Sequence, residues 1–320
     1  MTLLEIENLS KTYPGAHGTT VKAVSEVSLS VEAGEVLGIV GESGCGKSTL
    51  GRALLRLIEP SGGDIRFEGK SIAGLSRRQL KPFRRDMQII FQDPFGALNP
   101  RHKVGAIISE PLKVHKIGNT ASRAARIAEL LALVGLPEGS AERYPHEFSG
   151  GQRQRIAIAR ALALEPKLLV ADEAVSALDV SIQSQIINLI AELQEKLALS
   201  IIFISHDLSV IRHVSDRIAV MYLGRIVEIG PSEDVMETPA HPYTQALLSA
   251  IPRPNVPRAE RVVLKGELPD PANPPLGCAF HTRCPSAMPH CTTERPALVA
   301  RKIAACAKPA TTACHLYEVA

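Results

Sequence analysis

The sequence lacks any apolar run that approaches the ~20 residues needed to cross a bilayer, so we expect no membrane-spanning helix. Neither sign of charge is in clear excess, because 36 Lys and Arg residues face 33 Asp and Glu residues, for a net charge of +3. That balance argues against nucleic acid or an acidic surface as the default partner. The first residues contain no basic region followed by an apolar stretch, which argues against a secretory signal and favours a cytoplasmic chain.

The chain also lacks an internal repeat of fixed period, a low-complexity tract and sustained heptads. Its composition, with 45% hydrophobic and 22% charged residues, argues against a disordered protein. At roughly 150 residues per domain, the 320 residues suggest about two domains or one large one.

Over the first 240 residues, short apolar runs alternate with segments of helical spacing. The runs typical of buried strands cover residues 35–40, 87–91, 168–171 and 200–204. The segments with helical spacing cover residues 49–58, 123–134, 152–164 and 182–197. This alternation predicts an α/β fold whose sheet is mainly parallel, with helices on both faces. The stretch from about 100 to 165 has little strand signal and is interpreted as a helical insert.

The chain changes in character near residue 240. Residues 252–275 hold seven prolines, which disfavour helix interior and sheet and indicate an extended arm. Of the six cysteines, all but one follow residue 277. In a reducing compartment such a cluster is more typical of a metal site than of a disulfide framework.

A phosphate-binding loop is predicted at residues 41–48, whose sequence GESGCGKS matches G-x-x-x-x-G-K-[ST] after a strand and before a helix. Its glycines let consecutive N–H groups point at phosphate oxygens, and the helix that begins near Lys47 adds its positive end. Lys47 can reach the β- and γ-phosphates, and the Ser48 hydroxyl can ligate Mg²⁺. Cys45 stands at a variable position, where a small filler side chain is expected.

A pair of carboxylates, Asp172 and Glu173, follows the apolar run at 168–171. Ligands gather at the carboxyl ends of strands in open α/β sheets. We therefore expect Asp172 to hold Mg²⁺, directly or through water, and Glu173 to act as the general base on the attacking water.

The segment FSGGQ at residues 148–152 resembles the LSGGQ signature of the ATP-binding cassette (ABC) ATPases. Together with the two motifs above, this resemblance covers about residues 3–250 and implies a P-loop ABC ATPase core with a mixed, mainly parallel sheet. The remaining marks of the family follow in order: Tyr13 for adenine stacking, Gln92 for Mg²⁺ and the attacking water, Asp179 in a loop that crosses to the partner subunit, and His206 for the γ-phosphate.

The resemblance implies an ATP site built from Tyr13, Gly41, Ser43, Gly44, Cys45, Gly46, Lys47, Ser48 and Thr49. It implies Mg²⁺ ligation by Ser48, Gln92 and Asp172, and catalysis by Glu173, His206 and Gln92. It further implies that Ser149, Gly150, Gly151, Gln152 and Asp179 contact the ATP held by a second cassette. Two departures from the family are visible, since Phe148 replaces a leucine and Ala174 follows Glu173 where proline is common.

Within the family the chain is similar to the oligopeptide/dipeptide importer ATPases, and to the F-type second subunit among them. The segments that carry this similarity are residues 91–100, 143–148, 176–182, 220–224 and 241–249, with the proline-rich arm and the cysteine tail. We therefore expect a nucleotide-binding domain over 1–250, with a helical subdomain at about 95–165, and an arm and tail over 251–320.

The resemblance implies an ATPase that drives import of dipeptides or oligopeptides. Its partners would be a homologous ATPase subunit, two permeases and, indirectly, a substrate-binding protein. It would lie peripherally on the cytoplasmic side of a bacterial inner membrane, where the segment after Gln92 would meet a coupling helix of a permease. Two alternatives remain open at this point: the same role for another solute such as nickel or glutathione, and a soluble ABC ATPase acting on DNA or ribosomes.

The tail offers four thiolates, at Cys278, Cys284, Cys291 and Cys314, with Cys306 as a spare or alternative fourth ligand. The spacing differs from the C-x₂-C pairs of zinc ribbons, and four cysteines can hold either [4Fe–4S] or Zn²⁺. The resemblance favours a [4Fe–4S] cluster with a structural role.

Overall fold

The computed structural model describes residues 1–15, 18–250, 266–301 and 310–317. The chain divides into two compact units, each described by itself. Unit 1 contains Met1 and residues 32–35 and 74–204, and unit 2 contains residues 2–31, 36–73 and 205–320. Two of the sequence-based interpretations concern residues that are not described: residues 252–265 of the arm at 252–275, and the spare ligand Cys306.

Unit 1 is built on three parallel strands in the order β6, β7, β8. These strands are β6 (Met87–Ile90), β7 (Leu168–Asp172) and β8 (Ser200–Ile204). Both β7 and β8 are buried along their whole length, as expected for strands of a parallel sheet that is covered on both faces. All three strands confirm apolar runs that the sequence predicted as strands.

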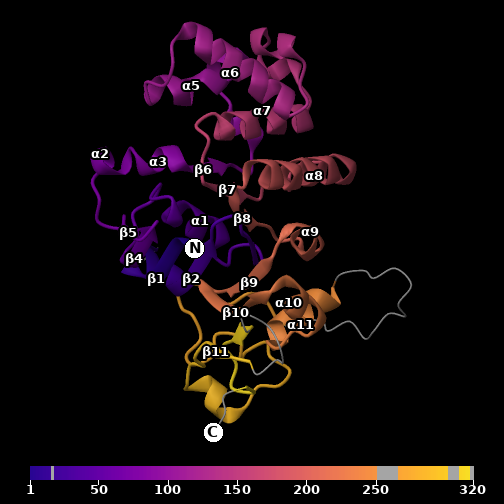
Figure 1. Cartoon of the computed structure of the whole chain (residues 1–320). Coiled ribbons are helices and arrows are strands. Elements are labelled where there is room, and N and C mark those ends of the chain that lie inside the picture. Colours follow the sequence, from indigo (N-terminus) through magenta and orange to yellow (C-terminus); the bar gives the residue numbers. More distant parts are fainter. Residues whose placement is uncertain (16–17, 251–265, 302–309, 318–320) are drawn as a thin grey trace. The chain divides into compact units, whose positions relative to one another are not determined.

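The helices of unit 1 lie between and after these strands. They are α2 (Arg77–Leu80), α3 (Phe83–Asp86), α4 (Pro94–Ala97), α5 (Val104–Val114), α6 (Thr120–Leu133), the 3₁₀ turns η2 (Glu138–Glu142) and η3 (Pro145–Glu147), α7 (Gly150–Leu162) and α8 (Val180–Leu197). Helices α5, α6 and α7 pack against one another, and α7 also contacts α8 and β6 (Figure 1). Because no strand interrupts residues 94–162, the helical character expected there is confirmed.

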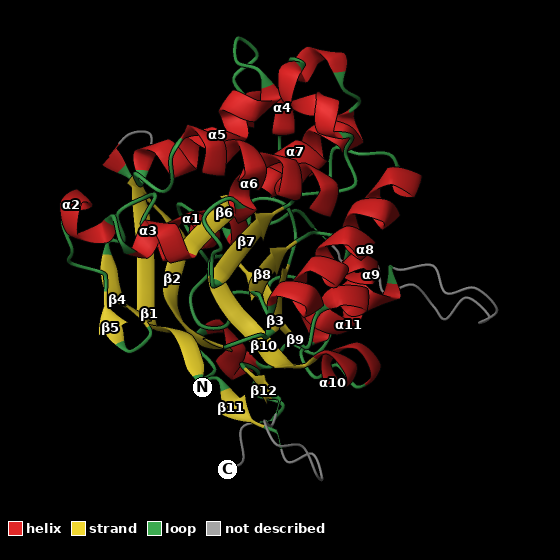
Figure 2. Cartoon of the chain, turned by 45° about the horizontal axis from the view of Figure 1, so that its top comes forward, coloured by secondary structure: helices red, strands yellow, loops and turns green. Residues whose placement is uncertain are grey.

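Unit 2 contains an antiparallel sheet that the sequence reading did not predict. Its strand order is β2-β1-β4-β5, and Figure 2 shows these strands in yellow. The strands are β1 (Thr2–Pro14), β2 (Thr20–Glu32), β4 (Gly62–Phe67) and β5 (Lys70–Ser71). The pairs β1–β4 and β4–β5 are antiparallel. The expectation of a mixed α/β architecture is therefore confirmed, with more antiparallel pairing than the alternation of strands and helices suggested.

The rest of unit 2 is a second set of strands in the order β11-β12-β10-β9-β3. They are β3 (Val36–Val40), β9 (Arg217–Tyr222), β10 (Arg225–Pro231), β11 (Val299–Ala300) and β12 (Thr311–Thr312). The pair β3–β9 is parallel, and the other pairs are antiparallel. Helices of this unit are α1 (Lys47–Leu54), α9 (Leu208–Val214), α10 (Ser232–Glu237), α11 (Pro242–Ser249) and the 3₁₀ turn η4 (Pro289–Thr292).

Two short tail strands thus extend the sheet beyond β10. Glu228 and Ile229 of β10 pair with Thr312 and Thr311 of β12. The approach is close, because a Cβ added to Gly230 would lie 2.5 Å from the Cβ of Ala310. The tail is therefore integrated into unit 2 by backbone pairing and does not hang from the end of the fold.

Candidate functional site

The phosphate loop lies in unit 2, between the end of β3 and the start of α1. Lys47 is 4% exposed, and its Nζ donates hydrogen bonds to the carbonyl oxygens of Gly41, at 2.9 Å, and Glu42, at 3.0 Å. Gly46 has φ 104°, and a Cβ there would lie 2.0 Å from the carbonyl oxygen of Ala23. The loop therefore has the tight curl and the lysine that phosphate binding requires.

Cys45 is buried in this loop, with 1% of its surface exposed. Burial raises the pKa of its thiol, so the side chain is a protonated filler and only its backbone can face a ligand. The Cys45 carbonyl accepts a hydrogen bond from the N–H of Gly224 at 2.8 Å, which ties the loop to the β9–β10 turn. The expected filler role of Cys45 agrees with this placement.

Tyr13 and His206 also belong to unit 2. Tyr13 is the penultimate residue of β1, is 37% exposed, and has the Lys11 ammonium 4.9 Å from its ring centroid. An exposed aromatic face of this kind can stack on a base. His206 is exposed in the loop that follows β8, beside Asp207, whose Oδ1 accepts a hydrogen bond from the N–H of Ser209 at 2.8 Å and caps α9.

The carboxylate pair lies in unit 1 at the end of β7. Asp172 is fully buried. The Glu173 carboxylate accepts a hydrogen bond from Gln92 Nε2 at 3.1 Å. The structure thus brings together the two side chains that the sequence predicted to act on the attacking water.

The backbone holds Glu173 in an unusual conformation, with φ 48°. Its N–H donates to the carbonyl of Ile204 at 3.0 Å, and its own carbonyl accepts from the N–H and the hydroxyl of Ser176, at 3.1 and 3.0 Å. Ala174, where the family commonly has proline, is 1% exposed. Hydrogen bonds from Ser176 therefore define the turn that places the Glu173 side chain beside Gln92.

The signature segment opens helix α7 in unit 1. Ser149 is the N-cap residue: the N–H of Gln152 donates to its Oγ at 3.3 Å, and its own N–H donates to Gln152 Oε1 at 3.0 Å. A Cβ on Gly151 would lie 2.5 Å from Ile182 Cγ2 on α8. The first turn of α7 can bind an anion through its N–H groups and dipole. It packs tightly against α8, whose N-cap position is held by Asp179 without a side-chain capping hydrogen bond.

The four predicted tail ligands all belong to unit 2 and lie within electrostatic range of one another, but they do not form a group whose sulfurs all lie within 4.8 Å of each other. Cys314 interacts electrostatically with each of Cys278, Cys284 and Cys291, and those three interact with one another. Burial raises the pKa of Cys278, Cys284 and Cys314, the last to about 11. All four are free thiols. Desolvated thiols that face one another are costly to ionise, so a bound metal would be needed to hold them as thiolates.

Backbone N–H groups surround these sulfurs. Those of Phe280 and His281 approach Cys278, that of Leu316 approaches Cys314, and that of Met288 donates to Cys291 Sγ at 3.4 Å.

A second possible ligand set overlaps the first, since ligand atoms of His290, Cys291 and His315 all lie within 4.8 Å of one another. Sequence reasoning missed this histidine pair, although both residues directly neighbour a cysteine in the sequence.

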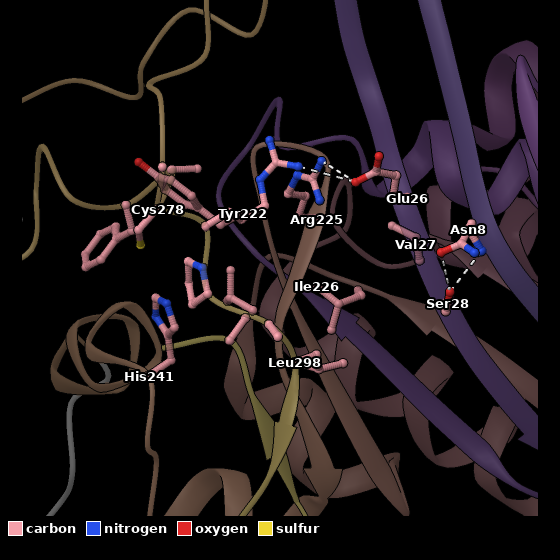
Figure 3. A pocket seen from close by; sticks show the side chains of 18 residues that line it. Asn8, Glu26, Val27, Ser28, Tyr222, Arg225, Ile226, His241, Cys278 and Leu298 are labelled. Carbon is pink, nitrogen blue, oxygen red and sulfur yellow. Dashed lines mark hydrogen bonds and ion pairs between the residues drawn. The ribbon is translucent and has the colours of Figure 1, made fainter. Parts of the chain in front are cut away.

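The tail packs on an aromatic cluster of unit 2. Phe280 is 1% exposed, and its ring centroid lies 5.3 Å from that of Tyr222, 5.4 Å from that of Tyr243 and 5.6 Å from that of His241. Beside it is a cavity of about 390 Å³, lined by Tyr222, His241, Cys278 and Phe280 among others. Figure 3 shows this cavity, with Glu26 paired to Arg225 on its polar side.

An ion pair between the tail and the phosphate loop was not predicted. The Arg283 guanidinium donates to both carboxylate oxygens of Glu42, from Nη1 at 2.6 Å and from Nη2 at 2.9 Å. The hydrogen bonds to Glu42 raise the pKa of Arg283. The two residues are 241 positions apart, so no local pattern in the sequence could have found the pair.

Two family models match the chain. The model described as ABC transporter matches residues 24–176, and the model described as oligopeptide/dipeptide transporter, C-terminal region, matches residues 227–291. Among the described residues, no helix is long and apolar enough to span a membrane.

Curated relatives match along nearly the whole chain. The oligopeptide transport ATP-binding protein AppF of Bacillus subtilis (strain 168) is 54% identical over 328 residues, which cover 99% of this chain and 98% of the relative. A putative peptide import ATP-binding protein of Brucella ovis is 54% identical over 297 residues, covering 92% of this chain and 93% of its own length.

Solved structures match the cassette. The dimeric post-hydrolysis state of the ATP-binding cassette MJ0796 bound to ADP and Pi has a TM-score of 0.66 and 30% identity, and it covers 72% of this chain and 99% of its own. CbiO1 from Clostridium perfringens, part of the transporter complex cbiONQ, has a TM-score of 0.65 and 31% identity, and it covers 74% of this chain and 91% of its own.

Proposed function

This chain belongs to the ABC transporter family and to its oligopeptide/dipeptide branch, and on that premise we propose that it is the ATP-hydrolysing subunit of a bacterial importer for dipeptides or oligopeptides. The observation that carries the proposal is the match to AppF, which extends through the cysteine tail to 99% of the chain. The fold is that of an ABC ATPase cassette, and ATP hydrolysis is the activity of the family.

In this proposal unit 2 binds the nucleotide. Tyr13 offers its exposed ring to adenine, and the loop residues Gly41 and 43–49 receive the phosphates. Lys47 exchanges its two carbonyl partners, at 2.9 and 3.0 Å in the structure, for phosphate oxygens, which are stronger acceptors because they are charged. His206 is proposed to contact the γ-phosphate.

Unit 1 is proposed to supply the residues that act on the attacking water. Bound Mg²⁺ would neutralise charge on the phosphates, and its proposed protein ligands are Ser48, Gln92 and Asp172. The full burial of the Asp172 carboxylate fits such a role, since buried carboxylates are found paired or coordinating a metal. Glu173, held by Gln92 at 3.1 Å, orients the water and accepts its proton as general base.

The signature is proposed to act on the nucleotide of a second cassette. The N-terminal end of α7, which favours negative charge, is formed by Ser149, Gly150, Gly151 and Gln152. Asp179 stands at the N-terminus of the neighbouring helix α8. We propose a homologous ATPase subunit as the partner, so that two cassettes enclose ATP between them and separate after hydrolysis.

The remaining partners follow from the same proposal. Two permeases would recruit the chain to the cytoplasmic face of the inner membrane, and a substrate-binding protein would act on the complex from the other side. These partners choose the solute, so transport of nickel or glutathione differs from peptide transport in its binding protein and permeases rather than in this cassette.

Reconstitution with the neighbouring permeases and binding protein tests the proposal. We expect peptide-loaded binding protein to stimulate ATP hydrolysis, and Glu173→Gln to reduce the hydrolysis rate at least a hundredfold while MgATP still binds. Stimulation by nickel or glutathione alone would overturn the peptide assignment. An unchanged ATPase rate in the Glu173→Gln complex would show that Glu173 is not the base.

We further propose that the tail holds a structural [4Fe–4S] cluster on Cys278, Cys284, Cys291 and Cys314. The electrostatic proximity of the four thiols and the N–H groups near them support this ligand set, because such hydrogen bonds to sulfur are typical of cluster sites. The alternative is Zn²⁺ on the same four cysteines, which predicts colourless protein that loses its zinc in Cys284→Ser. In addition, His290, Cys291 and His315 offer a different set of ligand types that Zn²⁺ commonly uses.

Anaerobic purification separates these alternatives. A cluster predicts brown protein that contains iron and sulfide, and loss of the colour in Cys284→Ser but not in His290→Asn. Zinc on the histidine set predicts colourless protein that loses its metal in His290→Asn and keeps it in Cys284→Ser. A metal-free wild-type protein with full ATPase activity would contradict both.

A further inference from the structure

The tail reaches the phosphate loop through one arginine. Arg283 is 7% exposed on its side chain, and Glu42, the second residue of the loop, is 27% exposed. Two parallel hydrogen bonds join them, at 2.6 and 2.9 Å. Bidentate pairs of this geometry fix orientation as well as charge, because the planar guanidinium matches the two carboxylate oxygens.

Arg283 is held firmly on the tail side. It lies in a turn closed by backbone hydrogen bonds from His281 to Cys278 at 3.0 Å and from Arg283 itself to Phe280 at 3.0 Å. Phe280 is buried in the aromatic cluster with Tyr222 and Tyr243. The next residue along the chain is Cys284. The guanidinium is therefore placed by the same turn that carries two of the four predicted cysteine ligands.

Glu42 is held equally well on the loop side. Its N–H donates to the hydroxyl of Tyr243 at 2.8 Å. Its carbonyl accepts hydrogen bonds from Lys47 Nζ at 3.0 Å and from the N–H of Cys45 at 3.3 Å. Its carboxylate is thus a fixed negative charge in a loop whose other features favour anions. Without a cation beside it, this charge would repel the phosphates of a nucleotide.

We propose that Arg283 is a positioning residue of the phosphate loop, which neutralises and anchors Glu42 so that the cysteine tail supports binding of the polyanionic nucleotide. The inference rests on the proposed function in one respect, that Gly41 and residues 43–49 bind ATP. It adds a role for the tail: when the turn at 278–284 loses its fold, the loop loses the partner of Glu42 and nucleotide affinity falls.

Binding of a fluorescent ATP analogue with Mg²⁺ to the full-length chain tests this role. We expect Arg283→Gln to raise Kd by about threefold to tenfold, the scale for one unit charge acting across a partly solvated site. The effect should shrink as salt is added, since screening weakens it. In the hydrolysis assay KM should rise, and kcat should change little, because Arg283 is proposed to act on binding.

The double variant separates a charge effect from general damage. Glu42→Gln should bind nucleotide as well as wild type or slightly better, and Arg283→Gln combined with Glu42→Gln should recover most of the lost affinity. Arg283→Lys keeps the charge without the bidentate geometry, so its nucleotide affinity should lie between those of wild type and Arg283→Gln. Arg295→Gln is the matched control, because Arg295 lies in the same tail and pairs with Glu26, at 3.3 Å, rather than with the loop.

The outcomes are distinct. Wild-type protein that binds no nucleotide would overturn the proposed function itself. Wild-type protein that binds, with an unchanged Kd in Arg283→Gln, would overturn the role of Arg283 alone. A loss of affinity that Glu42→Gln fails to rescue, or an equal loss in Arg295→Gln, would also overturn it, because the effect would then come from damage to the tail rather than from the charge of Glu42.

Discussion

His241 is a buried histidine whose ionisation should make unit 2 sensitive to acid. It caps α11 through Nδ1, which accepts a hydrogen bond from the N–H of Tyr243 at 3.1 Å, and its ring packs beside Phe280. Only 1% of its surface is exposed. Burial lowers its pKa from 6.5 to about 4, so the folded protein holds the ring neutral over a range in which the unfolded chain takes up a proton.

The sign and size of the effect follow by linkage. The pKa of His241 is lower in the folded protein than in the unfolded chain. The stabilisation that comes from keeping this ring neutral is therefore fully present above pH 6.5 and is lost as pH falls toward 4. Between pH 7.5 and 5 the loss in unfolding free energy is about 2 kcal/mol, and it approaches about 3 kcal/mol below pH 4. Burial also raises the pKa of Glu228, whose carboxylate accepts a hydrogen bond from the N–H of His241 at 3.0 Å.

The assay is urea unfolding of the full chain at constant ionic strength, from pH 7.5 to 5. His241→Asn keeps a capping acceptor but cannot take up the proton, so we expect its stability to fall by about 2 kcal/mol less than that of wild type. The comparison cancels contributions shared by both proteins, Glu228 among them. His102→Asn, at an exposed site, is the control and should follow wild type. Equal losses in wild type and His241→Asn would refute the reasoning.

Two further predictions concern packing. Gly151→Ala should destabilise unit 1 by about 1–3 kcal/mol through overpacking, because the new Cβ would lie 2.5 Å from Ile182 Cγ2. Adding Ile182→Ala to the same chain should restore part of the lost stability. Thermal unfolding of wild type and of the single and double variants measures both effects, and a double variant no more stable than Gly151→Ala would contradict the steric cause. Phe280→Ala should lower the free energy of unfolding by about 3–5 kcal/mol. Leu276→Ala, at a site that is 80% exposed, should change it by less than about 0.5 kcal/mol. Equal unfolding temperatures for these two variants would argue against the aromatic cluster as the anchor of the tail.

The sequence was most informative where function constrains the backbone. The helices that begin at Lys47 and Gly150 start where the motifs predicted, within one or two residues. The buried strands β7 and β8 were read from apolar runs alone. Each of these elements combines a short, strongly apolar or glycine-rich pattern with a fixed chemical task, so local residues nearly determine the conformation.

The strand β2 and the β9–β10 hairpin have weaker signals in the sequence. Residues 20–32 show part of the alternation typical of a half-buried strand, as β2 confirms. The β9–β10 hairpin turns at Leu223 and Gly224, whose φ values are 43° and 77°, and a glycine beside a bulky residue is a weaker turn signal than Asn-Gly. The predicted alternation placed a helix between successive strands. It therefore did not include antiparallel strands that are joined directly by a short turn.

The contacts that join the tail to unit 2 could not have been read from sequence. Arg283 and Glu42 are ordinary charged residues, and most such residues are solvated. Their pairing depends on β10, β12 and the aromatic cluster to bring distant segments together. For the cysteines the sequence predicted which residues would gather, because their chemistry is distinctive, but not the desolvation that raises the pKa of three of them.

The pairing of β12 with β10 has a practical consequence for anyone who shortens this protein. A truncated chain that stops before residue 277 loses β11 and β12, and β10 changes from an interior strand, paired on both sides, into an edge. Unprotected edges recruit strands from other copies, and the truncation would also leave Gly230 open where Ala310 now packs. Removal of the tail should therefore yield inclusion bodies or soluble aggregates rather than a minimal cassette. An affinity tag should be added after residue 320 rather than replace the tail.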